Sequence, residues 1–192
     1  MPEPEAGSLA TRLFRRALLR GTFTLRSGAT SDRYFDKYRV TCDPILLARI
    51  ADGLGELLAD AAFTTPIDRI VAPALGAVPL AAALSLASGV PFVIVRVDAK
   101  QHGTTSRIEG PFADGDRGFL VEDVVTSGGA ALEALDVARA AGMVIEHAAC
   151  LLDRDGGGAE ALATAGAPLR ALLHRRDLDA AFDAGIGSEV EA

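Results

Sequence analysis

Apolar runs of strand length alternate along this chain with segments of helical periodicity, and this alternation restricts the fold more than any other feature. The runs stand at residues 68–73, 91–97, 117–125 and 143–153. Parallel strands need crossover connections, which are usually helices, so the pattern predicts an α/β fold with a central, mostly parallel sheet flanked by helices. Residues 154–178 predict a loop, a short helix and a final strand.

The first part of the chain has a different pattern. Residues 9–17 place apolar side chains at helical spacing after Ser8, which suits an N-cap, and Gly21 is expected to end this helix. The stretch TFTLRSGATSDRYFDKY, residues 22–38, predicts a β-hairpin. Asp43, followed by proline, then predicts the start of a long helix, because a capping side chain precedes proline in the first turn.

Composition and charge exclude several classes of protein. The net charge of −7 argues against nucleic-acid binding, which depends on a basic surface. No apolar run reaches the roughly 18–20 residues that span a bilayer, and the start of the chain lacks the pattern of a secretory signal. Cys42 and Cys150 lie far apart without metal-ligand spacing, so we expect reduced thiols. These features predict a cytoplasmic protein that binds neither nucleic acid nor membrane.

One stretch stands out for its chemistry: FLVEDVVTSGGAALEAL, residues 119–135. Glu122 and Asp123 interrupt an apolar strand, and a turn of hydroxyl and glycine residues, 126–129, leads into a predicted helix. Ligands of open α/β sheets bind beyond the carboxyl ends of the strands. The turn can wrap N–H and hydroxyl groups around a phosphate at the positive end of the helix. The carboxylates can accept hydrogen bonds from sugar hydroxyls, so we interpret this stretch as a sugar-phosphate site.

The same stretch has a simpler interpretation, in which a solvated acid pair ends the strand and the glycines serve only the turn. The complete order of apolar run, acid pair, apolar pair, turn and helix favours a binding site instead. The turn is not a Walker A loop, which ends in Gly-Lys-Ser/Thr, and it is not a G-x-G-x-x-G dinucleotide loop.

The segment FLVEDVVTSGG resembles the phosphoribosyl-pyrophosphate (PRPP) binding signature of type I phosphoribosyltransferases. The resemblance implies the type I phosphoribosyltransferase fold, in which the acids bind the ribose hydroxyls and the turn binds the 5′-phosphate. The residues that it implies as PRPP ligands are Glu122, Asp123, Val124, Val125, Thr126, Ser127, Gly128, Gly129 and Ala130.

Three further segments resemble orotate phosphoribosyltransferases in particular. The first, GTFTLRSGATSDRYFD, is similar to the N-terminal hairpin of that family. It implies that a basic residue, Arg26, reaches PRPP and that an aromatic pair, Tyr34 and Phe35, borders the orotate pocket. Ordinary packing of the two rings in a strand is an equally open interpretation.

The second, VRVDAKQHGTTSRIEG, resembles the mobile catalytic loop of the family and implies that Arg96, Lys100 and His102 meet the pyrophosphate of PRPP. Lys100 and His102, together with Asp123, are the residues that the resemblance implies as catalytic. A loop with spaced cations can close over an anionic leaving group and exclude water. The alternative is a solvated charged loop. Val97 departs from the family pattern, because many members have a second basic residue there.

The third, CLLDRDGGGAEAL, implies that Arg154 binds the orotate carboxylate, with Thr126 as a second orotate contact. A guanidinium group suits this task because its fork pairs with two oxygens at once. The alternative is a surface ion pair of Arg154 with Asp153 or Asp155, which would contribute little to stability.

A fourth segment, VAPALGAVPLAAAL, resembles the short pyrophosphate loop of these enzymes. Some members have a lysine in place of Gly76, so the contact is expected here from the backbone N–H groups of Leu75, Gly76 and Ala77. The resemblance runs from about Leu9 to Leu178, and its motifs follow the order of the family.

Together these resemblances imply an orotate phosphoribosyltransferase, which converts orotate and PRPP to orotidine 5′-monophosphate and pyrophosphate in pyrimidine (UMP) biosynthesis. They imply Mg²⁺ as the cofactor, held by substrate oxygens and water rather than by protein ligands. They also imply a homodimer in which the loop 97–110 reaches the neighbouring site. The chain is expected to form a single domain, residues 1–192, with a hood of about residues 8–40 and a core of about residues 43–175.

Three other functions are open from the sequence. A phosphoribosyltransferase for another nucleobase would share the PRPP signature, although the hairpin and the Arg154 segment favour a carboxylated pyrimidine. A PRPP-binding regulatory protein without catalysis would need a basic face to bind nucleic acid, which a net charge of −7 disfavours. A dinucleotide-binding protein is disfavoured because the glycine fingerprint is missing.

Overall fold

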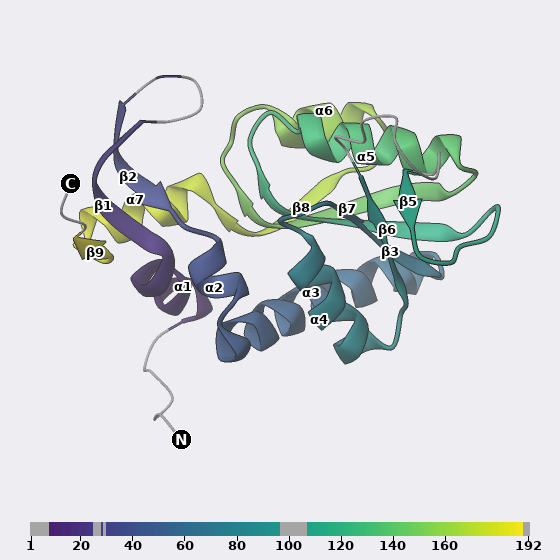
Figure 1. Ribbon diagram of the computed structural model, residues 1–192, viewed down its shortest axis with the longest axis horizontal. Coiled ribbons are helices and arrows are strands. Elements are labelled where there is room, and N and C mark those ends of the chain that lie inside the picture. The colour runs from purple at the N-terminus through teal and green to yellow at the C-terminus, as the bar shows by residue number, and fades with distance from the viewer. Residues whose placement is uncertain (1–7, 25–27, 29, 97–106, 190–192) are drawn as a thin grey trace. The chain divides into compact units, whose positions relative to one another are not determined.

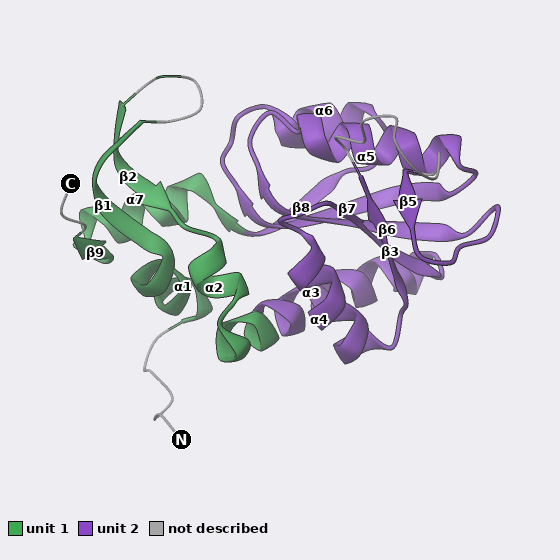
Figure 2. Cartoon of the chain, viewed as in Figure 1, with its two compact units in different colours: residues 1–49, 173–192 green, residues 50–172 purple. Residues whose placement is uncertain are grey.

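The computed structural model of this chain divides into two compact units, which Figure 2 shows in different colours. Unit 2 consists of residues 50–172. Unit 1 combines residues 1–49 with residues 173–192, so the chain leaves this unit and later returns to it. The structure describes residues 8–24, 28, 30–96 and 107–189.

Unit 2 is built on a six-stranded sheet with the order β5-β4-β3-β6-β7-β8. β3 pairs in parallel with β4 and β6, and β6 pairs in parallel with β7, whereas the short β5 is antiparallel to β4. The strands are β3 (Arg69–Pro73), β4 (Phe92–Val95), β5 (Ile108–Glu109), β6 (Arg117–Val125), β7 (Val144–Asp153) and β8 (Leu169–His174), the last of which continues into unit 1. The predicted mostly parallel sheet is confirmed, and β5 is an unexpected strand in a segment predicted to be a loop.

Helices cover both faces of this sheet (Figure 1), as predicted. α5 and α6 lie on one face, and α4 lies with the unit 2 part of α3 on the other. The helices are α3 (Pro44–Thr64), α4 (Val78–Ser88), α5 (Gly129–Ala140) and α6 (Gly158–Thr164). Leu120 and Ile145 of the sheet pack in one buried cluster with Leu135 of α5. Coverage of both faces explains why β6 and the second half of β7 are buried almost without interruption. Within the described part of the chain, no helix combines the length and the apolar character needed to cross a membrane.

The helix start predicted at Asp43 is confirmed by its capping geometry, and the end of α4 is capped as well. The Oδ1 atom of Asp43 accepts hydrogen bonds from the backbone N–H groups of Ile45 and Leu46 at 3.0 and 3.1 Å, which satisfies two donors in the first turn of α3. Gly89 follows α4 with a φ of 76°, and its N–H group donates to the carbonyl oxygen of Ser85 at 2.9 Å. Glycine adopts this left-handed conformation without a Cβ clash.

Unit 1 contains a three-stranded sheet with the order β2-β1-β9. β1 and β2 form the predicted antiparallel hairpin, and β9 pairs in parallel with β1. The elements of this unit are α1 (Leu9–Ala17), β1 (Leu18–Thr24), β2 (Thr30–Phe35), α2 (Tyr38–Thr41), α7 (Arg175–Asp183) and β9 (Ser188–Glu189). α7 and β9 have no counterpart among the predicted elements.

The prediction that the first helix ends at Gly21 is wrong. α1 ends at Ala17, and Leu18 is already extended, with φ −80° and ψ 115°. Leu18 pairs with Phe35 across the hairpin, and both side chains are buried. Pairing with a distant segment of the chain therefore overrides the local helical spacing.

α7 is held against the hairpin by two arginines that stack on one ring. The Cζ atoms of Arg20 and Arg33 lie 4.0 and 3.9 Å from the ring centroid of Phe182. Arg20 Nη1 also donates a hydrogen bond to the carbonyl oxygen of Phe182 at 2.8 Å. Arg33 Nη1 donates to Asp179 Oδ1 at 2.9 Å. The C-terminal segment therefore completes unit 1 through cation–π contacts as well as through the pairing of β9.

Replacing Phe182 by leucine tests this contact. The change keeps an apolar side chain but removes the ring, so the free energy of unfolding should fall by about 1–2 kcal/mol, because each cation–π contact contributes ~0.5–1 kcal/mol. Urea denaturation followed by circular dichroism measures the change. The same substitution at Phe63, which is 93% exposed, is the control and should cost less than ~0.5 kcal/mol. Equal losses in the two variants would contradict a role for the ring.

Candidate functional site

Four neighbouring strands of unit 2 end at one edge of the sheet, because β4, β3, β6 and β7 are parallel. The turns that follow them carry residues from four separate motifs. These are Arg96 after β4, Leu75 and Gly76 after β3, residues 126–130 after β6, and Arg154 after β7. The fold thus places the described part of the predicted PRPP and orotate ligands in unit 2 at a single edge, where open α/β sheets bind their ligands.

The acid pair lies where β6 approaches this edge. Glu122 and Asp123 are 7% and 3% exposed. Both side chains reach toward the end of the strand: Glu122 Oε1 accepts the N–H of Asp123 at 3.0 Å, and Asp123 Oδ1 accepts the N–H of Val124 at 2.6 Å. The interpretation of a solvated acid pair is therefore wrong. Successive side chains of a strand point to opposite faces, so a carboxylate flanks the backbone on each side.

The β6 turn, residues 126–129, joins β6 to α5. Thr126 and Ser127 are exposed, and Gly128 precedes α5 with a φ of 80°, a left-handed conformation that favours glycine. Gly128, the N-cap residue of α5, has no side chain that could cap this end of the helix. The first N–H groups of a helix have no partner within it, and they carry the positive end of the helix dipole. The turn can therefore bind an anion such as a phosphate group.

The β7 turn, residues 154–158, lies directly against the β6 turn. The N–H group of Arg154 donates to the carbonyl oxygen of Val125 at 2.8 Å. The N–H group of Gly158 donates to the carbonyl oxygen of Thr126 at 2.9 Å. Backbone hydrogen bonds therefore join the β7 turn to the last residue of β6 and to the first residue of the β6 turn.

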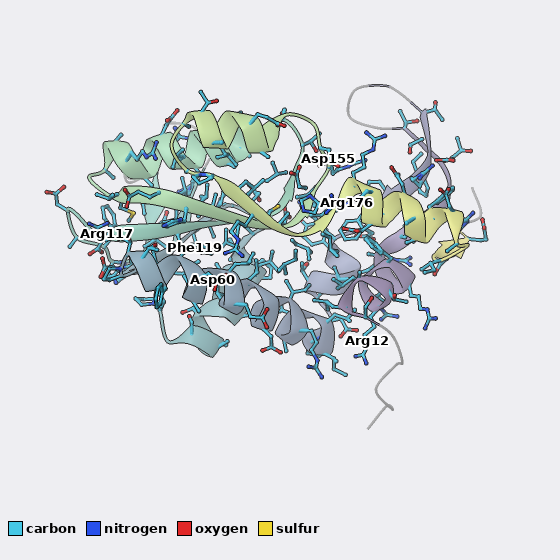
Figure 3. All side chains as sticks on the ribbon, turned by 180° about the vertical axis from the view of Figure 1, so that it is seen from behind. Arg12, Asp60, Arg117, Phe119, Asp155 and Arg176 are labelled. Atoms are coloured by element: carbon cyan, nitrogen blue, oxygen red, sulfur yellow. The ribbon has the colours of Figure 1, made fainter. Side chains whose placement is uncertain are left out.

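The side chain of Arg154 is half-buried in this turn. Among the residues that the structure describes, the ion pairs of unit 2 do not include Arg154, so the alternative of a pair with Asp153 or Asp155 is not observed. Asp155, which is labelled in Figure 3, instead donates its N–H group to Asp153 Oδ1 at 2.9 Å. This bond orders the start of the turn without involving the guanidinium group of Arg154.

The β3 turn, residues 74–77, presents its backbone at the same edge. The peptide bond between Ala74 and Leu75 is cis. Leu75 is 71% exposed and Gly76 is half-buried. The N–H group of Ala74 donates to the carbonyl oxygen of Val95 at 2.8 Å, which ties the start of the turn to β4. α4 follows, so this turn also lies at a helix N-terminus, where backbone N–H groups attract anions.

The predicted catalytic loop begins and ends at adjacent points of the sheet edge. Arg96 and Arg107 continue the pairing of β4 with β5, because the N–H of Arg96 donates to the carbonyl oxygen of Arg107 at 2.8 Å. Arg96 Nη1 also lies 3.3 Å from Glu109 Oε1. Both side chains of this pair are about half exposed, so the pair contributes little to stability. Arg107 forms an ion pair with Glu133 of α5.

Several predicted site residues lie outside the described residues or outside unit 2. Arg26, Val97, Lys100 and His102 are outside the described residues. Tyr34 and Phe35 belong to unit 1. The ring of Tyr34 is 45% exposed, and it lies 5.5 Å from the ring of Phe23 between centroids. Phe35 is buried edge-on against Phe14, with ring centroids 6.2 Å apart. Strand packing therefore accounts for Phe35, and the contact of either ring with orotate stays a prediction.

Two residues of this region were not predicted as part of the site. Asp153 is 4% exposed at the end of β7, next to Val125 in the β6 register. Its signal in the sequence, an acid at the end of an apolar run, is the same as that of Asp123. Cys150 pairs with Glu122 and is fully buried. Burial raises the pKa of the Cys150 thiol well above its usual range, and the negative charges of Asp153 and Glu122 raise it further, so this thiol is no nucleophile.

The described carboxylates at this edge suit a hard cation. Glu122, Asp123 and Asp153 have oxygen atoms of the kind that Mg²⁺ prefers, but within the described part of the chain these three residues do not form one group of ligand atoms. Magnesium often takes only one or two protein carboxylates and completes its shell with water and substrate phosphates. The residues present therefore fit a magnesium ion that arrives with a phosphorylated substrate.

Comparison with known proteins gives a consistent result. Residues 43–165 match the family described as phosphoribosyl transferase domain. The orotate phosphoribosyltransferase of Halobacterium salinarum is 43% identical over 161 residues, which cover 82% of this chain and 87% of that protein. The crystal structure of orotate phosphoribosyltransferase from Aeropyrum pernix has a TM-score of 0.76 at 30% identity and covers 93% of this chain and 99% of its own.

A second solved structure was determined with a ligand. It is the orotate phosphoribosyltransferase of Mycobacterium tuberculosis in complex with PRPP, with a TM-score of 0.72 at 31% identity, and it covers 89% of this chain and 96% of its own. The predicted fold is confirmed by these similarities. On the strength of the family match and of relatives such as the one from Halobacterium salinarum, this chain belongs to the orotate phosphoribosyltransferase family.

Proposed function

We propose that this chain transfers the 5-phosphoribosyl group of PRPP to orotate, which yields orotidine 5′-monophosphate and pyrophosphate for the synthesis of UMP. Family membership supports this reaction, and so does the complex of the Mycobacterium tuberculosis relative with PRPP. The observation that carries the proposal is the end of β6, where the buried pair Glu122 and Asp123 precedes an uncapped helix N-terminus. That arrangement suits a sugar whose hydroxyls and phosphate are recognised separately.

The acid pair acts on the ribose. Breaking the bond between C1′ and the pyrophosphate oxygen places positive charge on the sugar and negative charge on the leaving group. Glu122 and Asp123 accept hydrogen bonds from the ribose hydroxyls and stabilise the developing cation. The residues Val124–Ala130 hold the 5′-phosphate through backbone N–H groups and the hydroxyls of Thr126 and Ser127. Together they hold C1′ in a fixed position for attack by the base.

The leaving group is bound from the β3 turn and the catalytic loop. Backbone N–H groups of Leu75, Gly76 and Ala77 face the pyrophosphate from one side, and Arg96, Lys100 and His102 bring cationic or donor groups from the other. When bound, Mg²⁺ would be held mainly by substrate oxygens and water with the acid pair nearby, and it would supply positive charge to the pyrophosphate. Closure of the loop excludes water, which would otherwise compete with orotate for C1′.

Orotate is held by Arg154 and Thr126, both of which border the β6 turn. The guanidinium fork of Arg154 pairs with the two carboxylate oxygens of orotate. We place Tyr34 and Phe35 at the border of the base pocket and Arg26 near PRPP, as the family resemblance implies.

We also propose the organisation of the protein. Residues 8–40 act as a hood for a catalytic core of residues 43–175 within one domain. Two copies form a homodimer in which the loop 97–110 serves the neighbouring site. The cytoplasm is the compartment, which agrees with two cysteines that are both free thiols.

An assay with PRPP and Mg²⁺ tests the reaction directly. Loss of orotate absorbance should depend on both PRPP and protein, because the base is consumed as it joins C1′. Uracil, adenine and hypoxanthine are run in parallel and should react far more slowly, since they lack the carboxylate that Arg154 binds. If the protein converts one of these bases and does not convert orotate, that base is the substrate instead of orotate. Binding of PRPP without turnover of any base would indicate a regulatory protein.

Replacing Arg154 by lysine tests the orotate contact. Lysine keeps the charge but loses the fork, so the KM for orotate should rise roughly tenfold or more while the KM for PRPP stays within about twofold. Steady-state kinetics with each substrate varied in turn measures the two constants. The matched control is Arg170→Lys on β8, where the arginine forms an exposed ion pair with Asp60 at 2.9 Å. An unchanged KM for orotate in Arg154→Lys would remove Arg154 from the site.

Mixing two inactive variants tests whether the loop serves the neighbouring site. Lys100→Ala lacks a loop cation and should lose turnover far more than PRPP affinity, whereas Asp123→Asn lacks a carboxylate. After subunit exchange, half of the dimers are mixed, and each has one site with an intact loop and intact acids. An equimolar mixture should therefore recover roughly a quarter of the wild-type rate. A mixture as inactive as its separate components would show that each loop serves its own subunit.

A further inference from the structure

The β6 turn and the β7 turn pack backbone on backbone, with no room for a side chain between them. A Cβ atom added to Gly158 would lie 2.4 Å from Cγ1 of Val125, 2.7 Å from the carbonyl oxygen of Thr126 and 2.9 Å from the nitrogen of Gly128. A Cβ atom added to Gly156 would lie 2.7 Å from Cγ2 of Thr126 and 2.9 Å from its carbonyl oxygen. Real Cβ atoms do not approach other atoms so closely, so either addition must displace the β6 turn.

The three successive glycines of the β7 turn are there for two different reasons. Gly157 has a φ of 88°, and a Cβ on it would meet nothing within 4 Å. Its requirement is conformational. Gly156 and Gly158 lie outside the left-handed region, so any residue could adopt their backbone angles. Glycine is required at these two positions because the β6 turn occupies the space that a side chain would need. Gly157 is therefore needed for the backbone conformation of the β7 turn, whereas Gly156 and Gly158 are needed for its contact with the β6 turn.

The same contact holds the groups that would bind phosphate. Gly158 donates its N–H group to the carbonyl oxygen of Thr126 at 2.9 Å, and a Cβ on Gly128 would lie only 3.1 Å from the Cα of Gly158. The β7 turn therefore restricts the positions of Thr126 and Gly128. Because α5 has no side-chain cap, the direction of its first N–H groups depends on the position of the β6 turn that leads into it.

We infer that Gly156 and Gly158 are positioning residues for the 5′-phosphate of PRPP: their bare backbones set the position of the β6 turn, and thereby the N–H groups that receive the phosphate. The identity of this phosphate rests on the proposed function. Preorganised donors bind an anion without reorganisation, so a small displacement of the turn weakens binding. The atoms nearest to a Cβ added at Gly156 or Gly158 belong to Val125, Thr126 and Gly128, so we expect the β3 turn, which is proposed to bind pyrophosphate, to keep its position.

Direct binding of two ligand fragments tests the inference. Ribose 5-phosphate occupies the acid pair and the β6 turn, whereas inorganic pyrophosphate occupies the β3 turn. In Gly158→Ala, titration calorimetry should show the dissociation constant of ribose 5-phosphate raised roughly tenfold or more, with that of pyrophosphate within about twofold of wild type. Gly156→Ala should show the same selective loss, and it replaces Gly158→Ala if that variant does not fold.

Gly157→Ala is the matched control. It strains the same turn through its φ angle but adds no atom near the β6 turn, so it should lower the melting temperature while leaving both dissociation constants within about twofold of wild type. Wild-type affinity for ribose 5-phosphate in folded Gly158→Ala and Gly156→Ala would overturn the inference. Equal weakening of both ligands, or equal weakening in Gly157→Ala, would also overturn it, because general damage to the fold would then explain the loss.

The wild-type protein separates this inference from the proposed function. If wild type binds ribose 5-phosphate but does not convert orotate, the proposed reaction fails, while a selective loss in Gly158→Ala still supports the positioning role. If wild type converts orotate but Gly158→Ala binds ribose 5-phosphate normally, only the positioning role fails.

Discussion

The parallel register of β6 and β7 is the constraint on which the site depends. Val125 pairs with Asp153, so the two strands end together and the turns that follow them start side by side. Successive side chains of a strand alternate between faces, so a slip of one residue would exchange the faces on which Glu122 and Asp123 lie. Packing on both faces of the sheet resists such a slip. The core that stabilises the fold therefore also determines where Glu122 and Asp123 lie.

Three buried carboxylates at the end of this sheet indicate that this region serves ligand binding rather than stability. Glu122, Asp123 and Asp153 are each less than a tenth exposed, and burial of a charge costs free energy unless hydrogen bonds compensate. Backbone N–H groups supply such bonds to all three. The field of these charges reaches Cys150, whose pKa they raise beyond the effect of burial alone. A negative field of this kind favours a ligand that becomes positive, as ribose does when pyrophosphate leaves.

Features with a local signal were predictable from the sequence. The apolar runs gave the parallel strands, and the acid pair with its glycine turn was recognised because motif and turn are contiguous. Features that depend on distant partners were not. Leu18 leaves the helix because it pairs with Phe35, and the polar segment of α7 is ordered by the contact of Phe182 with two arginines. Asp153 had a signal, an acid that ends an apolar strand, but its closeness to the β6 turn appears only in the fold.

Support by backbone rather than by side chains suits a phosphate site. A side chain that braces a turn has rotamers, and each alternative rotamer lets the turn move. The β7 turn braces the β6 turn through Gly156 and Gly158, which have no rotamers, and through two backbone hydrogen bonds. Arg154, the residue predicted to bind orotate, lies in the same β7 turn, and its backbone N–H group donates directly to Val125 at the end of β6. Under the proposed function, the backbone of these two turns therefore helps to set the position of the phosphate relative to the residue that binds the base.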